Sequence, residues 1–172
     1  MKPFITVLIF LLSANSGYCQ ALKKYPVSNS GCSAYFFCNP GTFDLAKSPD
    51  SSDVYTGECT VDDVGYGIIC VKLKDQINDM QTSENVLISY FDYLKTTLNI
   101  TSATGYGKGH KLKNKENTRG VIDYWKDKDN ENWKIKGWTD GKYIGCMYVY
   151  SKKELNETKS NIFLDGLLFP GM

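Results

Sequence analysis

Three aromatic-rich runs in the C-terminal half of the chain constrain the fold most. They cover residues 120–126, 132–139 and 142–150, and short polar segments separate them. Each run is rich in the aromatic and β-branched residues that strands favour. Strands joined by short connections lie side by side and antiparallel. The pattern therefore predicts a three-stranded antiparallel meander.

The dipeptide at 140–141, Asp-Gly, is a good two-residue turn between the second and third runs. A hairpin centred there pairs Ile135 with Cys146. It also pairs Trp133 with Tyr148, so that all four side chains lie on one face. A slip of one residue would turn that face outward, and the consistent apolar face therefore supports the predicted register.

The rest of the chain adds a strand, a hairpin and two helices. Residues 33–38 are strand-like and end at a Pro-Gly turn, and 54–61 and 66–73 form a hairpin around 62–65. Residues 22–31 and 44–53 are polar and predict loops. The apolar residues of 84–98 recur at spacings of three and four, which predicts a helix capped by Thr82 or Ser83. A second helical piece lies within 152–168.

This order predicts an α+β fold in which an antiparallel sheet, made of the hairpin and the meander, is covered by helices. After the N-terminal leader about 150 residues remain, which suits one domain. We assign 22–32 to a polar N-terminal segment and 33–172 to a single α+β domain.

Residues 1–21 have the features of a secretory signal peptide: an early lysine, an apolar run of about ten residues, and small residues after it. The run is about half the length of a bilayer span, and nothing later is longer, so we predict no membrane span. The expected location is secreted or periplasmic. Cleavage fits before Leu22 or before Gln20, and a lipid anchor on Cys19 is a third reading that the bulky Tyr18 disfavours.

Five cysteines follow Cys19, which suits an oxidising compartment, and their odd number leaves at least one without a partner in the chain. A hairpin centred between residues 64 and 65 sets Cys59 opposite Cys70, and we predict a disulfide between them. Cys38 is the other candidate for a bridge, to a neighbouring strand. Cys146 lies on the predicted core face and is expected to be a small buried side chain.

Several segments resemble the PsbP/Mog-like family of α/β/α sandwiches. The segment 35–41 resembles its opening strand, the helix at 84–98 follows the first hairpin as in the family, and 163–168 resembles its closing segment, where Asp165-Gly166 replaces the usual Ser-Phe. The likeness covers most of 33–169 and implies an α/β/α sandwich that docks on a protein partner, without a fixed catalytic set. In the general character of its sequence, the chain also resembles exported Bacteroidetes proteins.

Few residues suggest chemistry. The cysteine spacings lack the close pairs of zinc sites, so we predict no metal and no cofactor. A Cys–His hydrolase would need Cys38 as nucleophile and His110, the single histidine, as base, but no local signature supports it. The Gly-rich segment 105–109 lacks the Lys-Ser/Thr of a phosphate-binding loop. The absence of these motifs from the sequence argues against an enzyme.

A basic stretch is the best candidate for ligand binding. It contains Lys108, Lys111, Lys113, Lys115 and Arg119, which could meet an anionic glycan, a lipid head group or an acidic protein. Lysines at a sheet edge also prevent aggregation and need no ligand. The formal net charge of +1 gives no reason to expect a nucleic-acid partner.

These features give three hypotheses. The first is an exported, non-catalytic binding or accessory domain that acts through a protein partner. The second is a carbohydrate- or anion-binding module that uses the basic stretch or the aromatic residues of the meander. The third is the Cys38–His110 hydrolase.

Overall fold

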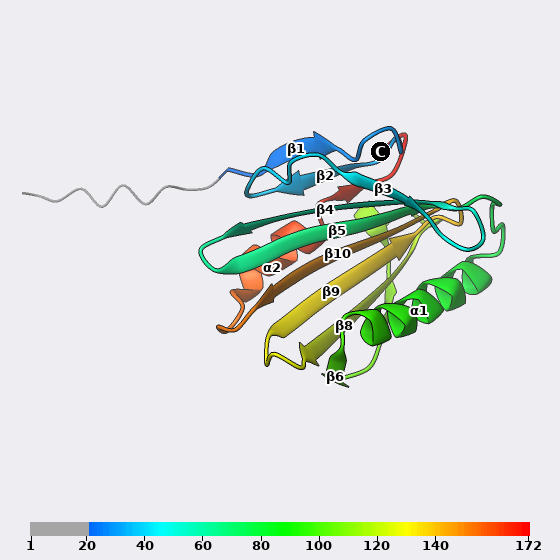
Figure 1. Cartoon of the computed structure of the whole chain (residues 1–172). Coiled ribbons are helices and arrows are strands. Elements are labelled where there is room, and N and C mark those ends of the chain that lie inside the picture. Colours follow the sequence, from blue (N-terminus) through cyan, green and yellow to red (C-terminus); the bar gives the residue numbers. More distant parts are fainter. Residues whose placement is uncertain (1–20) are drawn as a thin grey trace, which may run out of the picture.

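The computed structural model describes residues 21–172. The predicted signal peptide, apart from its last residue, and Cys19 lie outside the described residues. Within them, a large antiparallel sheet and two helices confirm the α+β prediction (Figure 1).

The main sheet has eight antiparallel strands in the described part of the chain, in the order β3-β4-β5-β10-β9-β8-β6, with β7 also paired to β8. Their bounds are β3 Asp44–Lys47, β4 Asp53–Val61, β5 Val64–Lys72, β6 Ile100–Ala103, β7 Gly107–His110, β8 Arg119–Asp127, β9 Asn132–Thr139 and β10 Tyr143–Ser151. The predicted meander is therefore confirmed as β8-β9-β10, and it sits beside the β4-β5 hairpin.

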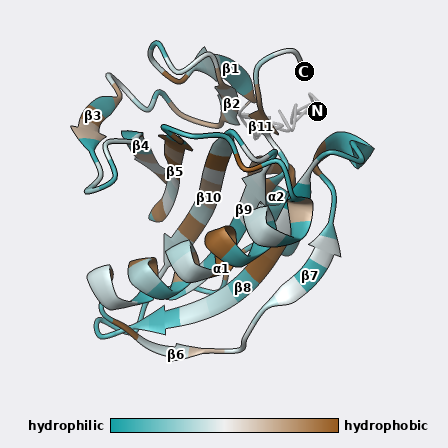
Figure 2. Ribbon diagram, turned by 90° about the vertical axis from the view of Figure 1, so that its right-hand side faces the viewer, coloured by the Kyte–Doolittle hydropathy of each residue, from teal (hydrophilic) through white to brown (hydrophobic). Residues whose placement is uncertain are grey.

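One face of the main sheet is covered by α1, Met80–Thr97. The helix buries Leu87, Phe91 and Leu94 against the sheet, and its apolar side faces the strands in Figure 2. Gly137 on β9 lies under the side chains of Leu87 and Phe91, where a Cβ atom would collide with both. The absence of a side chain at this position lets α1 pack closely on the meander.

The opposite face is covered by α2, Glu157–Leu164, and by a second sheet. That sheet has the strand order β1-β2-β11, with bounds Lys23–Pro26, Ser33–Phe36 and Leu167–Leu168. The rings of Phe36 and Tyr66 each meet the ring of Phe163 edge-on at 5.1 Å between centroids. Helices thus lie on both faces of the main sheet, but on this face a helix and a small sheet share the cover.

The segments 22–31 and 44–53, both predicted to be loops, each contain a short strand. Residues 23–26 form β1, paired with β2, and 44–47 form β3 at the edge of the main sheet. Both strands are four residues long and mostly exposed, and backbone pairing holds them in place, so neither shows the alternating apolar pattern of a half-buried strand. Helix α1 begins before the predicted position because Asp79, not Thr82 or Ser83, caps it by accepting from the Thr82 N–H at 2.7 Å.

Both hairpins are displaced by two residues or less from their predicted centres. The β4–β5 turn is formed by Asp62 and Asp63, both with positive φ, so that Cys59 lies opposite Tyr66. In the β9–β10 hairpin, Tyr148 lies opposite Ile135 rather than Trp133. In this hairpin each residue's partner moves by two positions from the predicted one. Because two is an even number, the predicted apolar face of the hairpin is retained.

The predicted Cys59–Cys70 disulfide is wrong. Cys59 is bonded to Cys38, with 5.9 Å between the Cα atoms, and Cys70 is a free, buried cysteine. The cause is the position of the β4–β5 turn, which removes Cys70 from its place opposite Cys59. Cys38 follows β2, and the bond therefore links the small sheet to the main one. Cys146 is free and fully buried, as predicted.

Replacing Cys38 and Cys59 together by serine is expected to lower the free energy of unfolding by about 3 kcal/mol, because the bridge closes a loop in the unfolded chain. The two cysteines are 21 residues apart in sequence. Urea denaturation measures the loss. Dithiothreitol should lower the stability of the unsubstituted protein by a similar amount and leave the double variant unchanged; equal stability of the two oxidised proteins would contradict the structural role.

Candidate functional site

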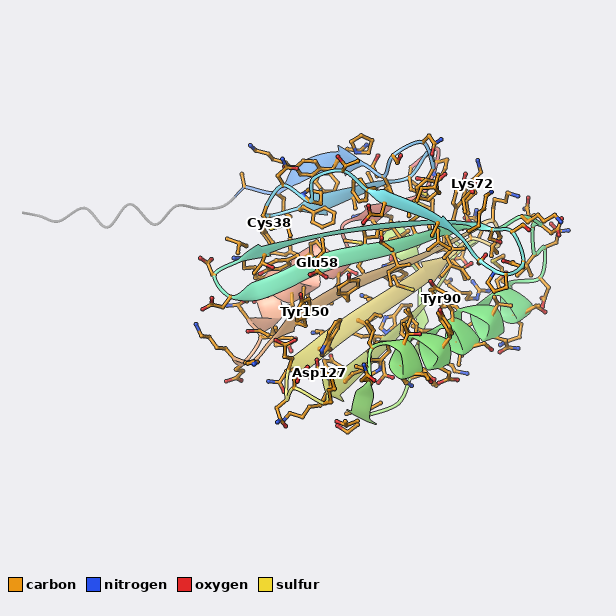
Figure 3. All side chains as sticks on the ribbon, in the orientation of Figure 1. Cys38, Glu58, Lys72, Tyr90, Asp127 and Tyr150 are labelled. Atoms are coloured by element: carbon orange, nitrogen blue, oxygen red, sulfur yellow. A yellow bond between two sulfur atoms is a disulfide. The ribbon has the colours of Figure 1, made fainter. Side chains whose placement is uncertain are left out.

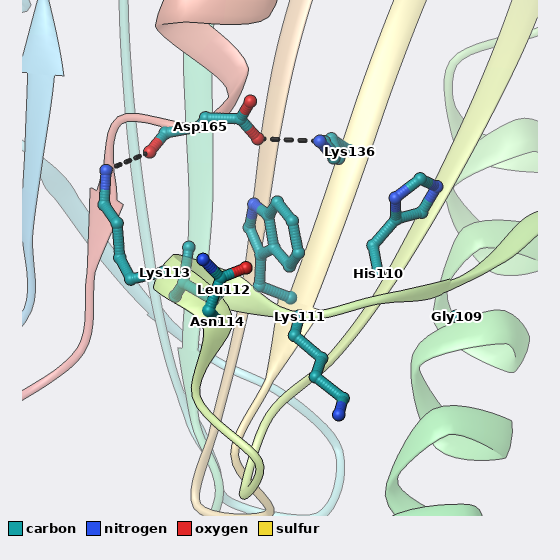
Figure 4. A pocket seen from close by; sticks show the side chains of 9 residues that line it. Gly109, His110, Lys111, Leu112, Lys113, Asn114, Lys136 and Asp165 are labelled. Carbon is teal, nitrogen blue, oxygen red and sulfur yellow. Dashed lines mark hydrogen bonds and ion pairs between the residues drawn. The ribbon is translucent and has the colours of Figure 1, made fainter.

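A cavity of about 480 Å³ opens on the face that α2 covers (Figure 4). Its walls come from the end of β7 and the short helix η1, Leu112–Asn114, from β9, and from the residue that ends α2. The lining residues are Gly109, His110, Lys111, Leu112, Lys113, Asn114, Lys136, Trp138 and Asp165. Three segments that are distant in sequence thus meet at one hollow.

Trp138 forms the inner wall of the cavity and is 2% exposed. Its ring lies over Gly120 of β8, where a Cβ atom would collide with the indole. Its Nε1–H donates to the Leu164 carbonyl at 3.2 Å, at the last residue of α2. This hydrogen bond fixes the end of the helix, and with it the next residue, Asp165, beside the cavity.

Lys136 extends from β9 beside the indole and is the most enclosed charged group at the site. Its Nζ lies 4.7 Å from the centroid of the Trp138 ring and 2.7 Å from Oδ1 of Asp165. The Lys136 side chain is 12% exposed, whereas that of Asp165 is 50% exposed. The ammonium group is therefore held against the aromatic wall, with a partly exposed carboxylate as its counter-ion.

Lys113 approaches the same residue from the opposite side of the cavity. Its Nζ donates to the main-chain carbonyl of Asp165 at 2.8 Å. Lys113 and Asn114 both have positive φ, at 49° and 59°, in the left-handed region that non-glycine residues seldom occupy. The short helix therefore bends back toward α2, and this bend brings a second ammonium group to the cavity.

His110 lies beside Lys136 at the cavity, with Lys113 on the opposite side (Figure 4). Partial burial lowers the pKa of the imidazole below its ordinary value, and the positive charge of Lys136 lowers the pKa further. The negative charge of Asp165 acts in the opposite direction without reversing the shift. The ring is therefore neutral at pH 7 and offers one donor and one acceptor to a ligand.

The predicted basic stretch does not act as one surface. Lys111 donates both hydrogen bonds of a salt bridge to Glu116, at 2.6 and 2.7 Å, and points away from the cavity in Figure 4. Arg119 donates to the main-chain carbonyls of Glu116 and Thr118. Lys108 and Lys115 are exposed and do not line the cavity. Of the five predicted basic residues, Lys111 and Lys113 line the cavity, but only Lys113 turns its ammonium group toward Asp165, because that of Lys111 is paired with Glu116.

Lys136 and Asp165 are the charged site residues that sequence reasoning missed, whereas Trp138 is one of the meander aromatics that the second hypothesis proposed for ligand binding. The alternation of Lys136 and Trp138 on β9 places both on the α2 face, which was a usable signal. The contribution of Asp165 carried no such signal, because it depends on how α2 lies across the sheet.

The nucleophile that the hydrolase hypothesis requires is not available in the structure. Cys38 is bonded to Cys59, and a disulfide sulfur has no thiolate. Nor does Cys38 line the cavity that contains His110. The interpretation of Cys38 as a catalytic residue is therefore wrong, and His110 belongs to a site without a cysteine.

The meander aromatics divide between the two faces of the sheet. On the α1 face, the rings of Trp133 and Tyr150 stack with 4.4 Å between centroids. Tyr148 and Tyr150 extend over Gly67 and Gly65 of β5 and donate to the two carboxylate oxygens of Glu58 at 2.8 and 2.6 Å. Glu58 and Tyr150 are labelled in Figure 3. Because these hydroxyls and the Glu58 carboxylate bind one another, the group ties β10 to β4 across β5.

Two acidic residues of the meander are also structural. Asp123 is fully buried and accepts from the Trp125 indole N–H at 2.6 Å. Asp127, labelled in Figure 3, accepts from the main-chain N–H groups of Asp129 and Glu131 and from the Trp133 indole. The hydrogen bonds of Asp127 shape the turn after β8, and the Asp123 carboxylate binds the Trp125 indole and lies 3.2 Å from Nζ of Lys95, so we do not assign either carboxylate to a ligand site.

Within residues 21–172, no group of three or more histidine, cysteine, aspartate or glutamate side chains could hold a metal ion, and no helix is long and apolar enough to cross a membrane. Comparison with known protein families and with curated proteins gave no match for this chain. The candidate site therefore rests on its own geometry.

Replacing Lys136 by glutamine is expected to raise the pKa of His110 toward its ordinary value, because one positive charge facing the imidazole is removed. Since His110 is the single histidine, its ring resonances in an NMR titration report this pKa without overlap. Replacing Lys152, which does not line the cavity, should leave the titration unchanged. Equal His110 pKa values in the Lys136 variant and the parent protein would contradict the geometry.

Proposed function

We propose that this protein is an exported, non-catalytic binding domain whose Trp138 cavity takes a small anionic ligand. The observation that carries the proposal is the convergence of two ammonium groups, from Lys113 and Lys136, and a neutral imidazole on one aromatic-walled cavity. An enclosed lysine such as Lys136 favours negative charge, and an aromatic wall favours a ligand with an apolar side, such as a sugar ring.

The charges of the lining support an anion over a neutral or cationic ligand. Lys113 and Lys136 bring two positive charges to the cavity, Asp165 brings one negative charge, and the ammonium group of Lys111 is paired with Glu116. The volume of about 480 Å³ suits a ligand of the size of a monosaccharide or a small organic acid. Enzymatic turnover is not part of the proposal, since the described lining contains no serine, threonine or cysteine nucleophile, and its one carboxylate, Asp165, is paired with Lys136.

Export is part of the proposal and is supported by the leader-like N-terminal sequence and the Cys38–Cys59 bond, which suits an oxidising compartment. Kinship with the PsbP/Mog-like sandwiches also remains a proposal. It is supported by helices on both faces of an antiparallel sheet, while the small sheet beside α2 is an added feature.

The proposal is tested by titrating the protein with sodium sulfate and with sodium D-glucuronate while following the His110 resonances. A bound anion is expected to raise the pKa of His110, because it favours the imidazolium form. Replacing Lys136 by glutamine should weaken binding at least tenfold, and replacing Lys152 by glutamine should not. Absence of saturable shifts with either anion up to tens of millimolar would reject the anion site.

The same linkage predicts a pH dependence. A ligand that raises the pKa of His110 takes up protons on binding, so its affinity increases as the pH falls through the titration range of the histidine. Lys136 and Asp165 face the imidazole and set that range. Replacing His110 by glutamine should remove this part of the pH dependence in calorimetric titrations.

A protein partner is the second candidate, and a different surface favours it. Strand β3 is an edge of the main sheet, and beside it lies an apolar groove of about 420 Å³ between the β3–β4 loop and α1. The groove includes Val54, Tyr90 and Tyr93, and Tyr93 is 59% exposed. An extended peptide pairing with β3 would place alternate apolar side chains in this groove.

A hexapeptide of alternating valine and threonine is a direct probe of this surface. Replacing Tyr93 by aspartate is expected to weaken its binding, because a charge enters the apolar groove. The matched control replaces Tyr124, an exposed tyrosine outside the groove, by aspartate. Isothermal titration measures both; binding that is absent, or equal in the two variants, would reject this surface.

A further inference from the structure

Asp165 is in an unusual position for a residue that lines an anion-binding cavity. Among the described residues of the lining, it alone carries a negative charge. Its Oδ1 lies 2.7 Å from Nζ of Lys136, the most enclosed cation of the site. The position in which a ligand anion would meet Lys136 is therefore already taken by a carboxylate of the protein itself (Figure 4).

We infer that the Asp165 carboxylate occupies the position that a ligand carboxylate takes when it binds. The cavity takes a small carboxylate-bearing molecule, whose carboxylate replaces that of Asp165 on Lys136. The inference rests on the proposed anion-binding function and adds to it the class of ligand and an internal competitor. In the empty protein the Asp165–Lys136 pair neutralises the buried end of the lysine, and in the occupied protein the ligand does so.

The surroundings of Asp165 allow its side chain to leave without disturbing the fold. Its main chain is held at both polar atoms, since the N–H donates to the Asn161 carbonyl at 3.0 Å and the carbonyl accepts from Lys113 at 2.8 Å. The carboxylate, in contrast, is half exposed and has Lys136 as its ion-pair partner. A rotation of the side chain into water therefore breaks this ion pair without moving the main chain, and it becomes favourable when another anion takes the place of the carboxylate on Lys136.

Lys136 cannot leave in the same way. Its main chain belongs to β9, its side chain is 12% exposed, and its ammonium group lies against the Trp138 ring. Burial makes an unpaired ammonium group costly, so a departing Asp165 must be replaced by another anion. This asymmetry, with a mobile carboxylate on a fixed cation, is what makes exchange with an external carboxylate possible.

The same geometry favours a monoanionic carboxylate over a phosphate or sulfate dianion. After exchange, Asp165 remains attached to a fixed main chain beside the cavity, and its charge repels the bound anion. A carboxylate reproduces the pairing that the empty protein already makes with Lys136, whereas the second charge of a dianion meets no second enclosed lysine, because Lys113 is exposed. Asp165 therefore sets both the affinity and the charge preference of the cavity.

The test is calorimetric titration of the full mature protein with sodium D-glucuronate, sodium phosphate and D-glucose. Replacing Asp165 by asparagine is expected to tighten glucuronate binding five- to tenfold, because the competitor and its repulsion are both removed. Asp63→Asn is the matched control, since Asp63 forms an exposed ion pair of the same length, 2.7 Å, with Lys153 outside the cavity. Asp165→Ser is a second variant without the carboxylate, and melting temperatures verify that each variant folds.

The outcomes distinguish the proposed anion site from the inference that Asp165 competes with a carboxylate ligand. Tighter glucuronate binding in both Asp165 variants, with no change in Asp63→Asn and no binding of glucose, supports the inference. Glucuronate binding that depends on Lys136 but is equal or weaker in the Asp165 variants overturns the internal competitor and leaves the anion site intact. Tighter binding of phosphate than of glucuronate by the parent protein overturns the carboxylate class, and no anion binding in any variant overturns both proposals.

Discussion

The hydrogen bond from the Trp138 indole to the Leu164 carbonyl is the contact on which the candidate site depends. It joins β9 of the main sheet to the end of α2, through two residues that are 26 apart in the sequence. The indole can lie flat enough to make this bond because Gly120 on the neighbouring strand has no side chain beneath it. Once the end of α2 is fixed, Asp165 must lie beside Lys136, and the cavity follows.

Glycines under large rings recur across the main sheet and explain how its two faces differ. Gly65 and Gly67 allow the rings of Tyr150 and Tyr148 to cross β5, and Gly137 allows α1 to approach β9. Each absent side chain is matched by a large ring on a neighbouring strand or helix. On the α1 face these arrangements fill the space with ring stacking and hydrogen bonds, whereas on the α2 face Trp138 leaves one side of its ring beside a hollow.

The sequence predicted the order of the elements well, because hydrophobic periodicity and turn residues are local signals. It predicted the faces of the meander for the same reason: the register shift at the β9–β10 hairpin is an even number, so the side chains kept their sides. It did not predict the Cys38–Cys59 bond, because that pairing depends on where the Asp62–Asp63 turn falls and on how the small sheet packs. Polar edge strands such as β3 gave no periodic signal at all.

The site was predictable to a similar extent. His110, Lys111 and Lys113 are neighbours in sequence; the basic stretch identified the two lysines as binding candidates, and His110 was a candidate only as the base of the hydrolase hypothesis. Lys136 and Asp165 join them through packing between distant elements, and no spacing in the chain indicates that contact.

A crystal structure of the protein with D-glucuronate tests the central claim most directly. The account predicts the sugar carboxylate within hydrogen-bond distance of Lys136 Nζ, the sugar ring beside Trp138, and the Asp165 carboxylate turned away from the lysine. An unoccupied cavity at saturating ligand, or a ligand bound elsewhere with the Asp165–Lys136 pair intact, would contradict it.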